Sequence, residues 1–335
     1  MCGCRSFINN IKIFAMKNTV RQCMNSALGG RERKGTGRMT LMRYVWRTVE
    51  QMDAVNKKRT KEIYLTALRS FMEFRQGKDI ALDRLDSDMI LKYESYLLDV
   101  RGISRNSSSF YMRALRALYN RAVDAGVVAD CCPFKHVYTG VDRTVKRALP
   151  LKSIKKIMNL DLSDRPRAAF ARDLFMFSFY TRGMSFVDMA YLRKSDLGNG
   201  VLTYRRRKTG QLLQIRWEKC MQAIIERYGN GADGYLLPII TKEGCDVRQQ
   251  YLGAICATNV LLKEVGAAAG ISQPLTTYVA RHSWASIAKQ KNVPLSVISE
   301  GMGHDNEKTT RIYLAALKSS AVDKANSTVI KALMG

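Results

Sequence analysis

The stretches VARHSWAS (residues 279–286) and GMGHDNEKTTRIYLA (residues 301–315) decide how this sequence is interpreted. They contain two of the chain's three histidines, and they place Arg281, His304 and Tyr313 in one C-terminal segment. Phosphoryl transfer by a protein nucleophile needs an oxygen that attacks, cations that hold the non-bridging oxygens, and an acid for the leaving oxygen. The segment therefore predicts phosphoryl transfer with Tyr313 as the nucleophile.

A hairpin supplies the remaining group. Residues 201–204 and 212–217 alternate as strands do, and RRRKTGQ (205–211) between them has good turn chemistry. Lys208 at the tip is a flexible point charge that can reach into a site. A phenol, with a pKa near 10, is also a better leaving group than an alkoxide, so a tyrosyl intermediate stays reversible.

Together these motifs resemble the tyrosine recombinases, or phage-type integrases. The resemblance rests on the Arg-His pair of VARHSWAS, the Gly-His of GMGHDN, the nine-residue step from His304 to Tyr313, and Lys208 in RKTG. It covers residues 41–335. The resemblance implies that Tyr313 forms a 3′-phosphotyrosyl bond and that Lys208 protonates the 5′ leaving oxygen. It also implies that Arg281 clamps the phosphate and that His304 donates to a non-bridging oxygen.

The sequence departs from the family pattern at Tyr278, three residues before Arg281, where the family usually has His or Lys. A phenol can donate a hydrogen bond to phosphate, but it acts as a base near neutral pH only after a large pKa shift. His282, next to Arg281, is expected either to tie the helix end to a backbone group or to support the site.

A second departure concerns the first arginine of the family pattern. FYTRGMSFVDMAYLRKSDL (179–197) aligns best by Asp188, which puts Ser185 where Arg is expected and Arg182 three residues earlier. Three residues are about one helical turn, and Gly183 permits another backbone path, so Arg182 could reach the same phosphate. The alternative is Ser185 assisted by another cation such as Arg207. Asp188 is expected to buttress the active-site helix or an arginine.

The predicted fold is mainly α with a small β-hairpin or sheet (α+β), in a chain long enough for two domains. The resemblance makes these a SAM-like core-binding domain and a tyrosine-recombinase catalytic domain. The predicted boundaries are a flexible basic arm (1–40), a helical DNA-binding domain (41–130), a linker (131–150), a catalytic domain (151–318) and a C-terminal helix (319–335). The resemblance implies that this last helix docks to a neighbouring protomer; the alternative is that it folds back on its own domain. The arm is open to two other interpretations. Translation could begin at Met39, so that the residues before it are not part of the protein, or the arm could contact DNA.

Charge indicates the partner. The chain has 55 Lys and Arg against 29 Asp and Glu, a formal net charge of +26, which favours a polyanionic partner: nucleic acid first and an anionic membrane surface second. The resemblance makes this partner double-stranded DNA. No apolar run is long enough to span a membrane. The eight cysteines form no CxxC, which argues against a zinc site. We therefore expect no metal, no cofactor and a cytoplasmic protein of the bacterial nucleoid.

The resemblance also implies a homotetramer on paired DNA sites and a Holliday junction, with accessory DNA-bending or directionality proteins possible as partners. Two alternatives remain at this point. A type IB-like topoisomerase shares the nucleophile but acts as a monomer, and the helical domain and tail helix favour recombination over it. A non-catalytic DNA-binding relative is kept open by Tyr278 and by the displaced Arg182. The target sequence, and the choice among integration, excision and inversion, are not specified by these motifs.

Overall fold

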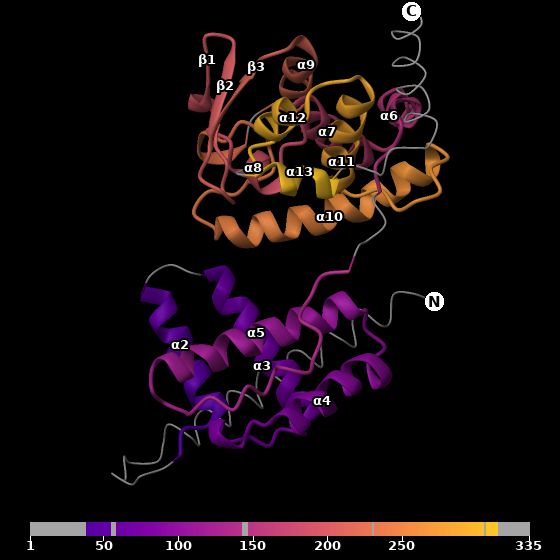
Figure 1. Ribbon diagram of the computed structural model, residues 1–335. Helices are drawn as coiled ribbons and strands as arrows, with labels where there is room; N and C mark the ends of the chain where they lie inside the picture. Colours follow the sequence, from indigo (N-terminus) through magenta and orange to yellow (C-terminus); the bar gives the residue numbers. More distant parts are fainter. Residues whose placement is uncertain (1–37, 55–57, 143–146, 230, 305, 314–335) are drawn as a thin grey trace, which may run out of the picture. The chain divides into compact units, whose positions relative to one another are not determined.

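The computed structural model describes residues 38–54, 58–142, 147–229, 231–304 and 306–313. The chain divides into two compact units, one that ends at Arg143 and one that begins at Thr144 (Figure 1). Nearly all of the expected basic arm (1–40) and all of the expected C-terminal helix (319–335) lie outside the described residues. The predicted fold class is confirmed, because both units are mostly helical and one carries a small antiparallel sheet.

The first unit is all helical. Its elements in chain order are α2 (Leu41–Ala54), α3 (Lys58–Phe74), the 3₁₀ turn η1 (Leu82–Arg84), α4 (Ser87–Ser95), the π-helical turn η2 (Tyr96–Val100) and α5 (Arg105–Asp124). Polar caps set where the helices begin. The sequence offers Asp86 or Ser87 as the cap of α4, and Asp86 takes this role: it accepts a hydrogen bond from the Met89 N–H (2.9 Å). The sequence pattern predicts that the next helix begins at Ser107, but Ser104 caps α5, which begins two residues earlier at Arg105.

The expected linker, 131–150, is packed over much of its length. Phe134 and Val137 are buried in the core of the first unit, and the N–H of Asp142 donates to Asn106 Oδ1 on α5 (2.7 Å). Leu149 is buried in the second unit. The division at residues 143 and 144 therefore falls inside the expected linker, because its apolar residues have cores to enter on both sides.

The second unit combines helices with a three-stranded sheet. Its longer elements are α6 (Leu151–Met158), α7 (Pro166–Tyr180), α8 (Phe186–Tyr191), β1 (Leu197–Gly198), β2 (Val201–Arg205), β3 (Leu212–Arg216), α9 (Lys219–Tyr228), α10 (Val247–Ala268), α11 (Thr277–Gln290), α12 (Leu295–Gly301) and α13 (Glu307–Tyr313), with short 3₁₀ turns η3 (Lys194–Asp196) and η4 (Ala232–Gly234). The sequence LPLKSIKKIM (149–158) predicts Ser153 as the cap of the first of these helices, and this prediction is wrong. Pro150 is the N-cap residue and α6 begins at Leu151, because proline's fixed φ suits the start of a helix.

The centre of this unit is α7, which packs against α6, α9, α10 and α11. Apolar side chains cover α7 on nearly all sides; Leu174, Phe175 and Phe177 are fully buried. A helix that is apolar all round belongs in a core. Its C-terminal end and the first turns of α11 are thereby fixed beside each other.

The sheet has the order β1-β2-β3 and is antiparallel throughout. Leu202 pairs with Ile215, and both side chains are buried, as the alternating pattern predicts. The turn between β2 and β3 closes with the Gly210 N–H donating to the Arg206 carbonyl (2.7 Å). The predicted hairpin is therefore present, with its tip at residues 207–209.

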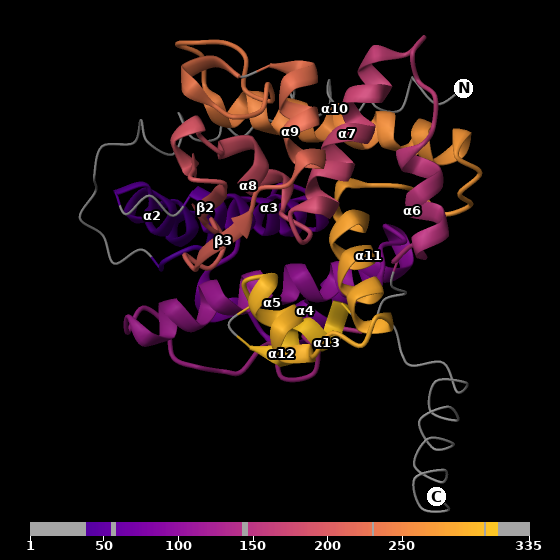
Figure 2. The same cartoon turned by 90° about the horizontal axis from the view of Figure 1, so that it is seen from above.

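The last helices of the described chain form a group. Figure 2 shows α11, α12 and α13 side by side, and each contacts the other two. None of the helices in the described ranges is both long enough and apolar enough to cross a bilayer.

Candidate active site

Arg281 lies in the second turn of α11, and only 4% of it is exposed. Its Nη1 donates to the Gly183 carbonyl (2.8 Å) and its Nη2 donates to the Met302 carbonyl (2.6 Å). These carbonyls belong to the turn after α7 and to the end of α12. The guanidinium therefore holds two loops together at one point.

His304 lies directly beside this guanidinium, with Nε2 2.9 Å from Nη2 of Arg281. A guanidinium can only donate, so Nε2 accepts and the ring proton is on Nδ1. Nδ1 in turn lies 2.7 Å from Oγ1 of Thr310 on α13. Burial lowers the pKa of His304 to about 4, and the positive charges of Arg281, Arg206 and Lys208 act in the same direction. The imidazole is therefore neutral near pH 7 in the free protein.

Arg182 reaches the same place from the turn after α7. Both Arg182 and Gly183 have a positive φ, +60° and +77°. A Cβ on Gly183 would lie 2.7 Å from the Cα of Arg281, so only glycine fits there. The side chain of Arg182 runs past Gly301, where its Cδ lies 3.4 Å from the position that a Cβ would take. Arg182 therefore lies in the loop cluster around Arg281.

Ser185 and Asp188 are engaged with each other. Ser185 is the N-cap of α8, and its Oγ donates to Oδ2 of Asp188 (2.6 Å). The other carboxylate oxygen accepts the backbone N–H of Arg207 (2.9 Å). Asp188 thus ties α8 to the base of the hairpin, while the Arg207 guanidinium lies over the Tyr191 ring at 3.9 Å.

Lys208 is exposed at the tip of the hairpin. It is close enough for its charge to contribute to the lowered pKa of His304. The structure therefore brings Lys208 toward the same cluster as Arg281, although 73 residues separate them in the sequence (281 − 208).

Tyr278 and His282 form a pair on one face of α11. Their rings meet edge to face with centroids 4.7 Å apart, and half of Tyr278 is exposed. They are four residues apart, which puts them on one face of a helix. Tyr278 also precedes Arg281 by one turn of the same helix.

Tyr313 is the last residue of α13. Its side chain is not among those described, but its helix is tied to the cluster through Thr310, three residues earlier. The helix α13 also packs against α11 and α12.

Sequence reasoning missed two residues of this cluster. Arg206 is 5% exposed, and its Nη1 donates to the Gly303 carbonyl. The period of two along the strand was the signal, because buried Leu202 and Tyr204 predict that position 206 also points inward. Thr310 is fully buried against His304 and carried no signal of its own.

The cluster is cationic around a neutral imidazole. Burial raises the pKa of the Tyr204 phenol, which lies beneath it. The charge of Asp188 acts in the same direction, while three arginines are near enough for their charges to oppose the rise: Arg281, Arg206 and Arg182. Convergent guanidinium and ammonium groups are suited to hold a phosphate.

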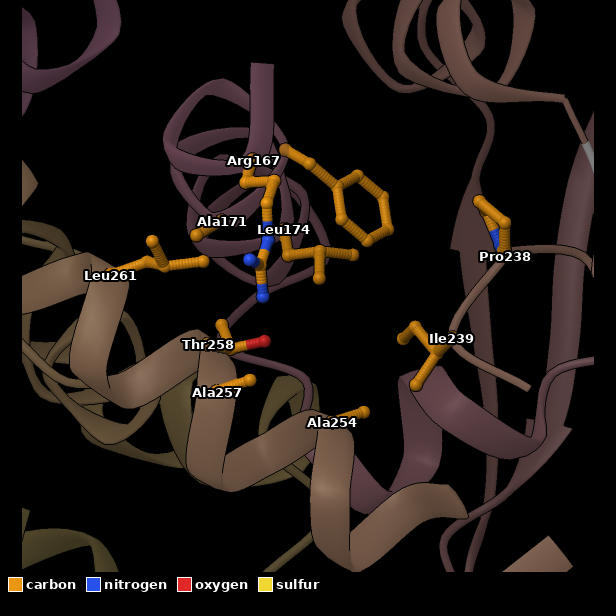
Figure 3. Close-up of a pocket in the computed structure, with 10 residues that line it drawn as sticks. Arg167, Ala171, Leu174, Pro238, Ile239, Ala254, Ala257, Thr258 and Leu261 are labelled. Atoms are coloured by element: carbon orange, nitrogen blue, oxygen red, sulfur yellow. The ribbon is translucent and has the colours of Figure 1, made fainter. Parts of the chain in front are cut away.

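A separate pocket of about 180 Å³ lies between α7 and α10 (Figure 3). Arg167 and Thr258 stand among mostly apolar lining residues that include Leu174 and Ile239. None of its lining residues belongs to the cluster around Arg281.

Comparison with known proteins gives two domain matches. Residues 40–137 match the phage integrase SAM-like domain, and residues 148–320 match the phage integrase family. The second match covers more than half of the chain. The first matched range lies within the first compact unit and the second lies within the second unit.

Individual relatives are distant. The tyrosine recombinase XerA of Thermococcus kodakarensis is 24% identical over 258 residues, which are 76% of this chain and 83% of that protein. A lambda integrase dimer bound to a COC′ core site has a TM-score of 0.62 at 15% identity, covering 82% of this chain and 95% of that one. A lambda integrase tetramer bound to a Holliday junction has a TM-score of 0.61 at 16% identity, covering 90% and 86%.

Proposed function

Because the chain belongs to the phage integrase family and is a tyrosine recombinase, we propose that Tyr313 is the nucleophile with which it cleaves and rejoins DNA. The phenolic oxygen attacks the scissile phosphorus and releases its proton to solvent, while the bond from phosphorus to the 5′ oxygen breaks. The product is a 3′-phosphotyrosyl bond. This bond conserves the energy of the broken phosphodiester, so rejoining draws on it and not on a nucleotide or a metal.

Arg281 and Arg182 hold the non-bridging oxygens of the phosphate. This assignment is supported by the close contact between Arg281 and Gly183, the residue that directly follows Arg182. Two guanidinium groups stabilise the charge that develops on phosphorus-bound oxygens during attack. The Ser185 hydroxyl is already hydrogen-bonded to Asp188, so Arg182 is the better candidate for the first arginine of the family pattern.

His304 adds a hydrogen bond to a non-bridging oxygen. In the free protein its Nε2 accepts from Arg281, and its pKa is about 4. An incoming phosphate draws the Arg281 donor to itself and adds negative charge, which raises the pKa of the imidazole. Nε2 can then carry a proton and donate it in a hydrogen bond. Tyr278 contributes a phenolic donor from the same helix as Arg281.

Lys208 is the general acid. It gives a proton from Nζ to the 5′ oxygen as the bond to phosphorus breaks, and it takes the proton back when the strand is rejoined. The tip of a hairpin suits this task, since a flexible ammonium can follow the leaving group. The contribution of Lys208 to the lowered pKa of His304 supports its placement near the reacting phosphate.

One observation carries this proposal. The buried contact between Arg281 and His304 is joined through Thr310 to α13, the helix that ends at Tyr313. The proposed phosphate clamp is therefore hydrogen-bonded to the helix that carries Tyr313, which supports the idea that clamp and nucleophile act on one phosphate.

We propose double-stranded DNA with paired sites as the substrate and a homotetramer as the working assembly. The net charge of +26 and the likeness to lambda integrase on DNA support this. The first unit binds DNA as a core-binding domain, the segment 319–335 docks to a neighbouring protomer, and the enzyme works on the nucleoid in the cytoplasm. Accessory DNA-bending or directionality proteins would act on the same synapse.

A trapped covalent complex tests the nucleophile. The probe is a nicked duplex that carries a site selected from random-sequence DNA by binding to the full chain. The short cleaved end diffuses away, so a protein–DNA adduct accumulates and is visible on a denaturing gel. We expect Tyr313→Phe to form no adduct and to keep its DNA affinity within about 2-fold, because phosphate contacts elsewhere dominate binding. An adduct formed by Tyr313→Phe would refute the assignment.

A further inference from the structure

Arg206 links the β2–β3 hairpin to the loop that precedes His304. Its backbone closes the base of the hairpin, with its N–H donating to the Gln211 carbonyl (2.8 Å). Its side chain leaves the hairpin and donates from Nη1 to the carbonyl of Gly303. Gly303 immediately precedes His304, and Lys208 follows Arg206 by two residues. One side chain thus lies between the proposed acid and the proposed phosphate donor.

The fit between these loops is close. Gly303 has φ +66°, and a Cβ there would lie 2.9 Å from Cδ1 of Leu213 and 3.1 Å from Cδ of Arg206. The loop before His304 therefore rests directly on the base of the hairpin. A side chain at position 303 would push the two loops apart.

Stability does not explain an arginine at this position. Arg206 is 5% exposed, the acceptor of its Nη1 hydrogen bond is a neutral carbonyl, and its buried Nε has no hydrogen-bond partner among the described residues. Removing a cation from water in this way is costly, and an apolar side chain of similar length is often as stable or more so. The arginine is better explained by a task performed on bound DNA.

We propose that Arg206 is a positioning residue that fixes the Lys208 hairpin against the His304 loop, so that the leaving-group acid stands in register with the phosphate clamp. The proposal rests on the assignment of Lys208 as the general acid. The charge of Arg206 also lowers the pKa of His304, which agrees with its closeness to the clamp.

A substrate with a better leaving group shows whether Arg206 acts by positioning the acid Lys208 or acts in another way. In the nicked duplex described above, sulfur replaces the 5′ bridging oxygen at the scissile phosphate. A thiolate leaves without protonation near neutral pH, since a thiol has a pKa of about 8.5. A variant that lacks a correctly placed acid is therefore slow on the oxygen substrate and restored on the sulfur substrate.

The variants are Arg206→Met, which keeps an apolar stem, Arg206→Lys, which keeps the charge, and Lys208→Ala as the reference. Arg216→Gln is the matched control, because Arg216 is an exposed arginine of the same hairpin with its salt bridge to Glu218. Gly303→Ala perturbs the same contact from the other side. Single-turnover cleavage rates and melting temperatures are measured for each.

On the oxygen substrate we expect Lys208→Ala to lose about 10²–10⁴-fold in rate and Arg206→Met to lose roughly 10–100-fold. Arg206→Lys should recover part of that loss, and Gly303→Ala should resemble Arg206→Met. On the sulfur substrate, Lys208→Ala and Arg206→Met should both approach the wild-type rate. The melting temperature of Arg206→Met should stay within about 3 °C of the wild type.

The outcomes separate the two proposals. If sulfur fails to restore Lys208→Ala, the general-acid assignment itself is wrong. If sulfur restores Lys208→Ala but not Arg206→Met, Lys208 remains the acid and Arg206 does not position it. A large fall in the melting temperature of Arg206→Met, with Arg216→Gln unchanged, would make Arg206 a structural residue and overturn the inference.

Discussion

Thr310 Oγ1 lies 2.7 Å from Nδ1 of His304, and Thr310 is three residues before Tyr313 on α13. Both side chains are buried. The hydroxyl accepts from the ring and so fixes which nitrogen faces Arg281. A threonine that touches no phosphate in the proposed mechanism thus orients the histidine that does.

Thr310→Val tests this relationship. Valine keeps the shape and removes the hydroxyl, which leaves a buried N–H without its acceptor at a cost of about 1–3 kcal/mol. We expect cleavage to fall about 10-fold or more, since the ring is free to take the wrong tautomer. Adduct formation and urea denaturation measure the two effects. Thr309→Val, at the neighbouring half-buried position, is the control and should change neither.

The pKa of His304 predicts how stability depends on pH. It is about 4 in the folded chain against 6.5 for an ordinary histidine. Between these values the unfolded chain binds the proton and the folded chain does not, so the free energy of unfolding falls as pH falls from 6.5 toward 4. The full difference is on the order of 3 kcal/mol. Urea denaturation at several pH values should show this component in the wild type and not in His304→Asn. Equal slopes in the two proteins would contradict the prediction.

Arg182→Ala should reduce cleavage by about 10²–10³-fold, the scale for loss of one preorganised donor at the reacting group. Ser185→Ala should reduce it much less, because this hydroxyl is bonded to Asp188 and caps α8. Single-turnover cleavage by the two variants decides between them. If Ser185→Ala proves the more damaging, the alternative register, in which Ser185 acts with another cation, is correct.

Truncation after Lys318 tests the proposed docking of the segment 319–335, which lies outside the described residues. We expect the truncated chain to bind a single site with unchanged affinity and to lose the tetrameric synapse on a native gel. The reason is that the apolar stripe of the predicted helix, which includes Val322 and Ile330, would have no protomer to enter. A lower melting temperature with intact synapsis would instead show that the segment belongs to its own unit.

Much of the fold could be predicted because amphipathic periodicity and caps are local signals. The helix capped by Asp86 and the hairpin around residues 205–211 follow from them. The start of α6 was misplaced because Pro150 competes with Ser153 as a helix start. The central helix α7 gives no periodic signal, since it is apolar on nearly every face.

The site was predictable only in its chemical groups. Motif spacing identifies Arg281, His304 and Lys208, but it does not show that a threonine and an arginine hold them in place. Thr310 lies in the same motif segment as His304, but its sequence position does not show that its hydroxyl faces the imidazole. Arg206 donates a hydrogen bond to a carbonyl 97 positions further along the chain, which no local pattern indicates. Such contacts depend on tertiary packing, which local pattern does not encode.

The close contact at Gly183 restricts which substitutions this sequence can tolerate. The glycine contributes no functional group, yet its missing side chain is what lets the backbone beside Arg182 lie against Arg281. If codons around the turn are randomised and active clones are selected, position 183 should remain glycine while half-buried neighbours such as Val187 tolerate exchange. A search for essential positions by chemical type alone would pass over it. A residue without a reactive side chain can thus be required for the proposed catalytic centre to form.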